Sequence, residues 1–186
     1  MKNEITGMRL RLIVMNFLQF AVWGAYLTSM GTYLFNIGLG AKIGLFYAMQ
    51  GIVSLFMPAI MGIIADRWVP AQKLYGFCHF MAAVFMVAAG WYGYVDGEAV
   101  NFGTLFTFYS LSVAFYMPTL ALTNSVAYTA LDKVKLDPVI AFPPIRIFGT
   151  IGFICSMLLT DILGFQNNYM QFFSCACFGV ILAVYA

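Results

Sequence analysis

Three residues with groups suited to holding a ligand, Arg146, Thr150 and Phe153, lie close together in the sequence. Their spacing of four and then three residues predicts that they share one face of a helix. Together they supply a planar hydrogen-bond donor, a hydroxyl and an aromatic ring, which a polar, ring-bearing ligand such as a nucleoside needs. The alternative is that Arg146 extends its side chain to the nearby membrane surface and contacts no ligand.

A second set of polar and aromatic residues, Gln19, Trp23, Tyr26 and Met30, recurs at helical spacing in the first apolar run. One such stripe on an otherwise apolar helix indicates a side that faces a pore. The alternative is that these side chains pack against neighbouring helices, which is the commoner use of an aromatic stripe.

The elements that position these residues are expected to be membrane helices. The chain has 186 residues, of which 63% are hydrophobic and 9% charged, with a mean hydropathy of +0.90. So few charges cannot solvate a globule of this size, which excludes a soluble enzyme and also the disordered, fibrous and disulfide-scaffold classes. The expected fold class is therefore an all-α polytopic membrane protein, because lipid offers no partner for unpaired backbone groups.

Charge-free runs divide the chain into six expected spans, each long enough to cross a bilayer, which takes about 20 apolar residues. The expected spans are residues 12–35, 43–65, 74–95, 101–129, 143–163 and 169–186. Residues 1–11 form the expected N-terminal segment. The last span ends in an apolar run without the charged or interfacial residues that usually close a membrane helix. We interpret the chain as one half of a longer protein.

Basic residues gather on one side of this arrangement. That side holds Lys2, Arg9, Arg11, Arg67, Lys73, Lys133 and Lys135, and the other side holds Lys42. Because Lys and Arg favour the cytoplasmic ends of membrane helices, the N-terminus is predicted to be cytoplasmic.

Metal, cofactor and nucleic-acid sites are not expected. His79 is the only histidine, the four cysteines lie in apolar runs without a zinc spacing, and the net charge is +2. We expect His79 to be a neutral residue satisfied by a neighbour, with a proton relay as the alternative. No carboxylate lies in the middle of a span, where a coupled proton would need one.

The connection between the second and third spans carries Gly62, Asp66 and Arg67. Gly62 permits close approach of a neighbouring helix, and Asp66 requires a partner, since the C-terminal end of a helix disfavours an anion. The Gly-x-x-x-Asp-Arg pattern resembles the signature loop of the major facilitator superfamily, which acts there as a conformational latch. Val69 and Pro70 stand where that family often has Gly and Arg, and an ordinary basic turn is the alternative.

Four stretches of the chain resemble the bacterial nucleoside:proton symporters of this superfamily, the group that contains the nucleoside and xanthosine permeases. They are Phe17–Phe20 with Trp23 and Gly24, Phe56–Ala59, Tyr116–Leu120 and, most specifically, Phe142–Phe153. The similarity runs from about Leu10 to the end of the chain.

The resemblance implies twelve helices in two six-helix halves around a central cavity, with this chain as the N-terminal half and the C-terminal half absent. It also implies proton-coupled nucleoside transport by alternating access in the bacterial inner membrane, with no enzymatic activity. By the same resemblance Arg146, Thr150 and Phe153 hold the nucleoside, and Gln19 and Trp23 occupy matching positions in the first span. Acids for proton coupling are then expected in the other half.

Other functions remain open to a chain of this kind. A facilitator for another polar solute, such as a sugar, would have the same fold. A six-span membrane subunit without transport activity would have the same hydropathy pattern. A six-span chain can also work as a dimer. A membrane enzyme is the weakest alternative, since one histidine and no close pair of carboxylates offer little catalytic machinery.

Overall fold

The computed structural model describes residues 2–186, except for the side chains of Lys2, Asn3 and Glu98. Met1 of the expected segment 1–11, and the side chain of Lys2 counted above as a basic group, lie outside the described part. The α-helices in that part are α1 (Lys2–Gly24), α2 (Met30–Asn36), α3 (Ile43–Arg67), α4 (Ala71–Asp96), α5 (Phe102–Lys133), α6 (Pro138–Ile162) and α7 (Met170–Tyr185). The expected all-α fold class is confirmed.

Five helices of the described chain are long and apolar enough to cross a membrane. They are Glu4–Gly24, Gly40–Arg67, Ala71–Asp96, Phe102–Lys133 and Pro138–Ile162, and the last helix, Met170–Tyr185, is apolar but shorter. Many large apolar side chains on these helices face outward, including Leu55, which is 73% exposed, and Ile147, which is 60% exposed. Such a surface suits lipid, and the chain is a multi-pass membrane protein.

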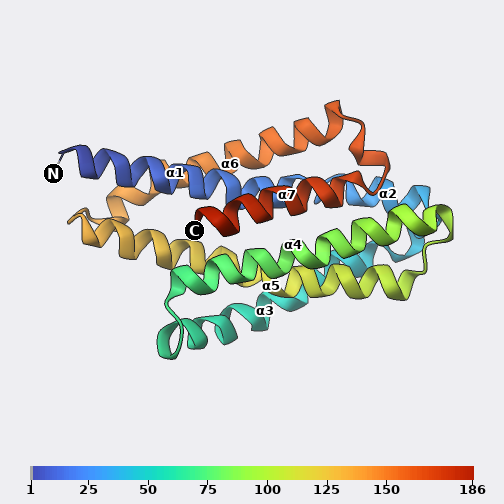
Figure 1. Ribbon diagram of the computed structural model, residues 1–186, viewed down its shortest axis with the longest axis horizontal. Helices are drawn as coiled ribbons and strands as arrows, with labels where there is room; N and C mark the ends of the chain where they lie inside the picture. The colour runs from blue at the N-terminus through green and yellow to red at the C-terminus, as the bar shows by residue number, and fades with distance from the viewer. Residues whose placement is uncertain (1) are drawn as a thin grey trace.

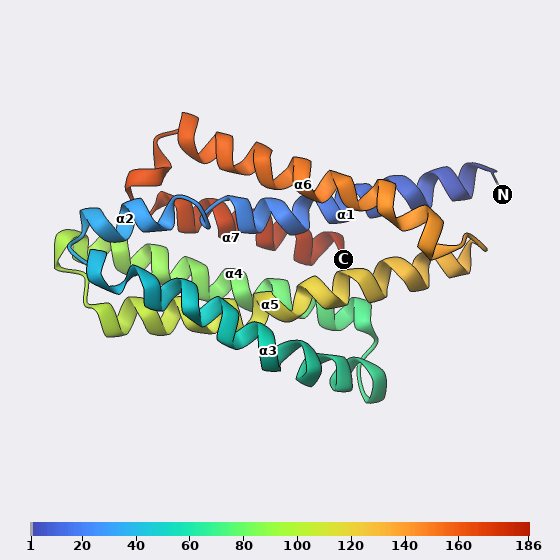
Figure 2. The ribbon, with the colours of Figure 1, turned by 180° about the vertical axis from the view of Figure 1, so that it is seen from behind.

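The helices form two layers that run roughly side by side (Figures 1 and 2). Helices α6, α1 with α2, and α7 make one layer, and α4, α5 and α3 make the other. The N-terminus, the α3–α4 and α5–α6 turns and the C-terminus lie toward one end, and the α2–α3, α4–α5 and α6–α7 connections lie at the opposite end (Figure 1). Helix α1 packs against α6 and α7, while α5 packs against α3 and α4.

The first expected span, 12–35, is not one continuous helix. Helix α1 ends at Gly24, a turn occupies residues 25–29, and α2 begins at Met30. Side chains of other helices satisfy the carbonyl groups that this break leaves free: Thr160 donates to Ala25 at 3.1 Å, and Tyr47 donates to Leu27 at 2.7 Å. Because these donors replace the lost helical bonds, the break is tolerated inside a membrane segment.

Helix α6 begins five residues before the expected start of its span at 143. Asp137 caps it by accepting a hydrogen bond from the Val139 amide at 2.9 Å, and Pro138 occupies the first turn. Pro143 and Pro144 therefore lie inside the helix and do not open it. Arg146 lies about two turns from the helix start, farther into the helix than a span that begins at residue 143 predicts.

Candidate functional site

The site begins with a close approach between helices α1 and α6. A Cβ atom on Gly152 would lie 2.1 Å from the carbonyl oxygen of Phe17, and one on Gly24 would lie 2.3 Å from the carbonyl oxygen of Phe153. Glycine at these two positions lets the backbones touch, as small residues do between membrane helices. The contact brings the Arg146 face of α6 against the aromatic side of α1.

Arg146 lies against an aromatic ring and keeps its hydrogen-bond donors available. Its guanidinium carbon lies 3.8 Å from the centre of the Phe20 ring, a cation–π contact that holds the planar group over that ring. The side chain is half-buried, and within the described chain no group accepts a hydrogen bond from it or pairs with its charge. An arginine in a membrane helix normally finds such a partner, so its open donors make Arg146 a candidate ligand-binding residue.

Thr150 and Phe153 continue this face of α6. Thr150 is exposed, and its hydroxyl makes no hydrogen bond to the described residues. Phe153 is half-buried and meets Trp23 edge-on, with ring centres 6.3 Å apart at 84°. The structure thus brings four of the five expected ligand residues into one strip between α6 and α1: Arg146, Thr150, Phe153 and Trp23.

Trp23 is held in place by two further helices. Its indole nitrogen donates to Gln50 Oε1 on α3 at 3.0 Å, and Gln50 Nε2 donates to the Tyr109 hydroxyl on α5 at 2.6 Å. Gln50 lies within the second expected span, 43–65, but nothing in the sequence pairs it with Trp23. Phe20 was also missed as a site residue, although its position three residues before Trp23 places it on the same side of α1.

Gln19, the fifth expected ligand residue, lies in a closed polar cluster. Its side chain is fully buried; Nε2 donates to Thr119 Oγ1 at 2.8 Å, and Oε1 accepts from the Tyr75 hydroxyl at 2.7 Å. Oε1 also accepts from Thr123 at 3.0 Å and lies 2.8 Å from His79 Nε2. The Gln19 amide therefore joins α1 to α4 and α5. It gives His79 Nε2 a hydrogen-bonding neighbour, but His79 Nδ1 is buried without a partner among the described residues, so the expectation of a satisfied histidine holds for one ring nitrogen only.

The expected latch residues lie at the end of α3. Asp66 and Arg67 are exposed, and neither forms an ion pair with a described residue. A Cβ atom on Gly62 would meet no atom within 4 Å, so the close helix contact expected at this glycine does not occur within the described chain. This end of α3 is therefore uncovered within the described chain.

Clusters of metal ligands are not found around the site. Among the described residues, no three His, Cys, Asp or Glu side chains come together in a way that could hold a metal ion. The groups at the strip between α1 and α6 are hydrogen-bond donors and aromatic rings, which recognise a polar ring compound by contact and orientation.

Comparison with known families and proteins gives a consistent result. The family model described as "Nucleoside H+ symporter" matches residues 6–186. The chain is 39% identical over 179 residues to the xanthosine permease of Escherichia coli K12, and this match covers 95% of the chain and 41% of the permease. It is 38% identical over 182 residues to the nucleoside permease NupG of the same organism, covering 96% of the chain and 42% of NupG.

The fold is similar to a solved transporter. The crystal structure of the nucleoside transporter NupG superposes with a TM-score of 0.87 at 37% identity, covering 96% of this chain and 43% of NupG. The chain thus spans less than half the length of the proteins that it matches, and its architecture is that of a six-helix half of a transporter.

Proposed function

Since this chain belongs to the nucleoside H+ symporter family, we propose that the complete protein carries nucleosides across the membrane together with protons. In this proposal the chain is the N-terminal half, and the substrate crosses by alternating access between it and a second half. The greater length of the matched relatives favours a C-terminal half on the same polypeptide over a second copy of the chain.

The single observation that carries the proposal is the state of Arg146. Its guanidinium is half-buried and fixed over Phe20, while its donors have no acceptor among the described residues. A nucleoside offers hydroxyl and ring acceptors to such a fork and a planar ring to the neighbouring aromatics. In our assignment Arg146 and Thr150 hydrogen-bond the nucleoside, and Phe153 and Trp23 pack against its rings.

Gln19 has a supporting part in this proposal. Both ends of its amide are engaged by protein groups, so it holds α1 in register with α4 and α5 and keeps Trp23, one turn further along, in position. Gly62, Asp66 and Arg67 form the conformational latch. Their uncovered end of α3 is the surface that a second half would engage and release as the transporter changes state.

We also propose a location and an orientation. The protein lies in the bacterial inner membrane with its N-terminus in the cytoplasm. The N-terminus and the turns after α3 and α5, which carry most of the basic residues, lie toward one end of the bundle, as the excess of Lys and Arg on the cytoplasmic side requires (Figure 1).

Uptake by the complete protein tests the function. Expressed in cells without nucleoside carriers of their own, it is expected to accumulate radiolabelled nucleoside, and excess unlabelled nucleoside should compete while a sugar should not. Raising the external pH from 6 to 8, or adding a protonophore, should lower accumulation because the inward proton gradient drives symport. Accumulation that ignores the proton gradient would reject the coupling, and competition by the sugar alone would favour the facilitator alternative.

A further inference from the structure

Two buried polar atoms without partners border one small cavity inside the bundle. His79 Nδ1 and the Tyr26 hydroxyl are buried, and neither has a hydrogen-bond partner among the described residues. Both side chains line a cavity between α1 with the turn after it, α4, α5 and α7, where the centre of a water molecule has about 10 Å³ in which to sit. Because buried polar atoms nearly always have partners, this cavity is a candidate binding site.

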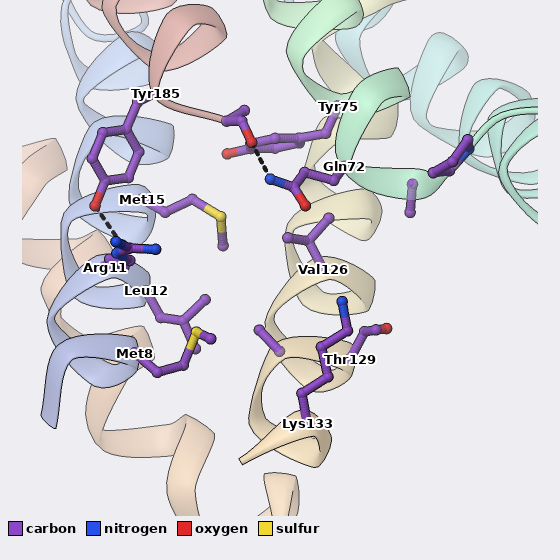
Figure 3. A pocket seen from close by; sticks show the side chains of 14 residues that line it. Met8, Arg11, Leu12, Met15, Gln72, Tyr75, Val126, Thr129, Lys133 and Tyr185 are labelled. Atoms are coloured by element: carbon purple, nitrogen blue, oxygen red, sulfur yellow. Dashed lines mark hydrogen bonds between the residues drawn. The ribbon is translucent and has the colours of Figure 1, made fainter. Parts of the chain in front are cut away.

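The helices of the described chain enclose this internal cavity. All ten residues that line it are buried, from Val22 on α1 to Gly179 on α7. It shares no lining residue with the larger hollow beside Tyr185, which Figure 3 shows. Its shape therefore follows from the packing of α1, α4, α5 and α7 on one another.

Neighbouring hydrogen bonds determine what His79 Nδ1 requires. The Thr119 hydroxyl donates to the Tyr116 carbonyl at 2.6 Å, so Thr119 Oγ1 accepts from Gln19 Nε2, and this orients the amide. Gln19 Oε1 can only accept, so His79 Nε2, 2.8 Å away, carries the ring proton and donates it. Nδ1 of the neutral ring is then an acceptor that lacks a donor.

The other polar groups of the lining leave the internal cavity short of donors. Ser112 donates its hydroxyl hydrogen to a carbonyl of α4 at 2.8 Å, and Tyr116 donates to a carbonyl of α1 at 2.8 Å. Both oxygens can therefore only accept from the cavity, as can His79 Nδ1. Tyr26 keeps a hydroxyl hydrogen to donate, and the Cys175 thiol is a weak donor. An occupant must donate at least one hydrogen bond, to Nδ1, and can accept one from Tyr26.

We propose that the internal cavity holds one ordered water molecule that links Tyr26 to His79. The water donates to His79 Nδ1 and to Ser112 or Tyr116, and it accepts from the Tyr26 hydroxyl. A buried water typically makes about three hydrogen bonds, and the space is sufficient for one such molecule. A cation fits less well, because no acidic side chain lines the cavity to compensate its charge.

The water connects the break after α1 to the cluster around Gln19. Tyr26 lies in the turn at residues 25–29, and His79 on α4 is bonded to the Gln19 amide. Thr160 on α6 and Tyr47 on α3 already donate to carbonyls of this turn. The water adds a link to α4, so three helices hold the break in place. The site is separate from the Arg146 strip and does not depend on the transported substrate.

A structure of the complete protein, at a resolution that shows other internal waters, tests the site. Density is expected in the internal cavity within about 2.5–3.2 Å of both His79 Nδ1 and the Tyr26 hydroxyl oxygen. A cavity without density would overturn the proposal. A direct hydrogen bond from Tyr26 to Nδ1 would overturn it as well, because both atoms would then be satisfied without water.

Removing one hydroxyl gives a second test with a matched control. Tyr26→Phe deletes a partner of the water and should lower the thermal unfolding temperature of the complete protein by about 2 °C. Tyr33→Phe is the control: its hydroxyl is also buried without a partner among the described residues, but Tyr33 does not line the internal cavity. The control should not lower the unfolding temperature. Equal losses in both variants would contradict the proposal.

If Tyr26→Phe does not fold, nuclear magnetic resonance decides on the unmodified protein. With histidine labelled with nitrogen-15, the His79 ring can be assigned through its contacts with the rings of Tyr75 and Tyr116. Magnetisation transfer from water protons to this ring is expected, since the bound water lies within hydrogen-bonding distance of Nδ1. A His79 ring without any transfer from water would overturn the proposal.

Discussion

Helix α1 contributes to two polar regions that differ in how many of their hydrogen-bonding groups have partners. The cluster around Gln19 faces α4 and α5, is fully buried and satisfies both ends of the amide within the protein. The strip around Arg146 faces outward between α1 and α6, and the guanidinium and the Thr150 hydroxyl have no hydrogen-bond partner among the described residues. Satisfied buried networks make a bundle rigid, whereas open donors on a rigid wall are available for binding.

The largest expected effect comes from removing the open donors. Arg146→Ala should lower nucleoside uptake by the complete protein about 100-fold, since two charge-assisted hydrogen bonds to the substrate are lost. The unfolding temperature should change little, because no described group relies on the guanidinium for a hydrogen bond. Arg146→Lys, which keeps the charge without the planar fork, should recover only part of the uptake. Normal uptake by the alanine variant would remove Arg146 from the site.

In the cluster around Gln19, a substitution is expected to lower the stability of the protein and not its affinity for nucleoside. Gln19→Met removes the amide at nearly constant volume and leaves the Tyr75 hydroxyl without its acceptor, whereas Thr123 keeps its hydrogen bond to the Thr119 carbonyl. The variant should lose about 1–3 kcal/mol of stability, the cost of leaving buried polar groups unpaired. Thermal unfolding in detergent measures this loss. A variant of full stability that no longer binds nucleoside would instead make Gln19 a direct ligand contact and erase the difference between the two regions.

A smaller effect is expected where a third helix supports the open strip. Gln50→Leu removes the acceptor of the Trp23 indole, so the ring loses its fixed orientation against Phe153. The KM for nucleoside should rise about fivefold, the equivalent of one ordinary hydrogen bond, with the maximal rate nearly unchanged. Tyr109→Phe, which removes only the group that Gln50 donates to, should have a weaker effect. An unchanged KM in both variants would show that Trp23 needs no support from α3.

The sequence alone is sufficient to predict an all-α membrane protein, because the hydropathy of each apolar run determines its structure without reference to the other runs. A chain so poor in charges has to place its apolar runs in lipid as helices, whatever their neighbours are. The same local logic puts Arg146, Thr150 and Phe153 on one helix face, since their spacing alone determines their angular positions. The Phe142–Phe153 stretch is specific enough to indicate the family as well.

Tertiary structure decided what each polar residue does. Gln19 and Trp23 lie one turn apart on the same helix, yet one faces α4 and α5 and the other faces Phe153. The break after Gly24 also depends on neighbours, because Thr160 and Tyr47 supply the hydrogen bonds that make it tolerable. Helical spacing fixes the direction of a side chain relative to its own helix. Only the packing of the helices determines whether a hydrogen-bonding partner lies in that direction. That partner separates Gln19, whose amide joins α1 to α4 and α5, from Arg146, whose guanidinium has no hydrogen-bond partner among the described residues.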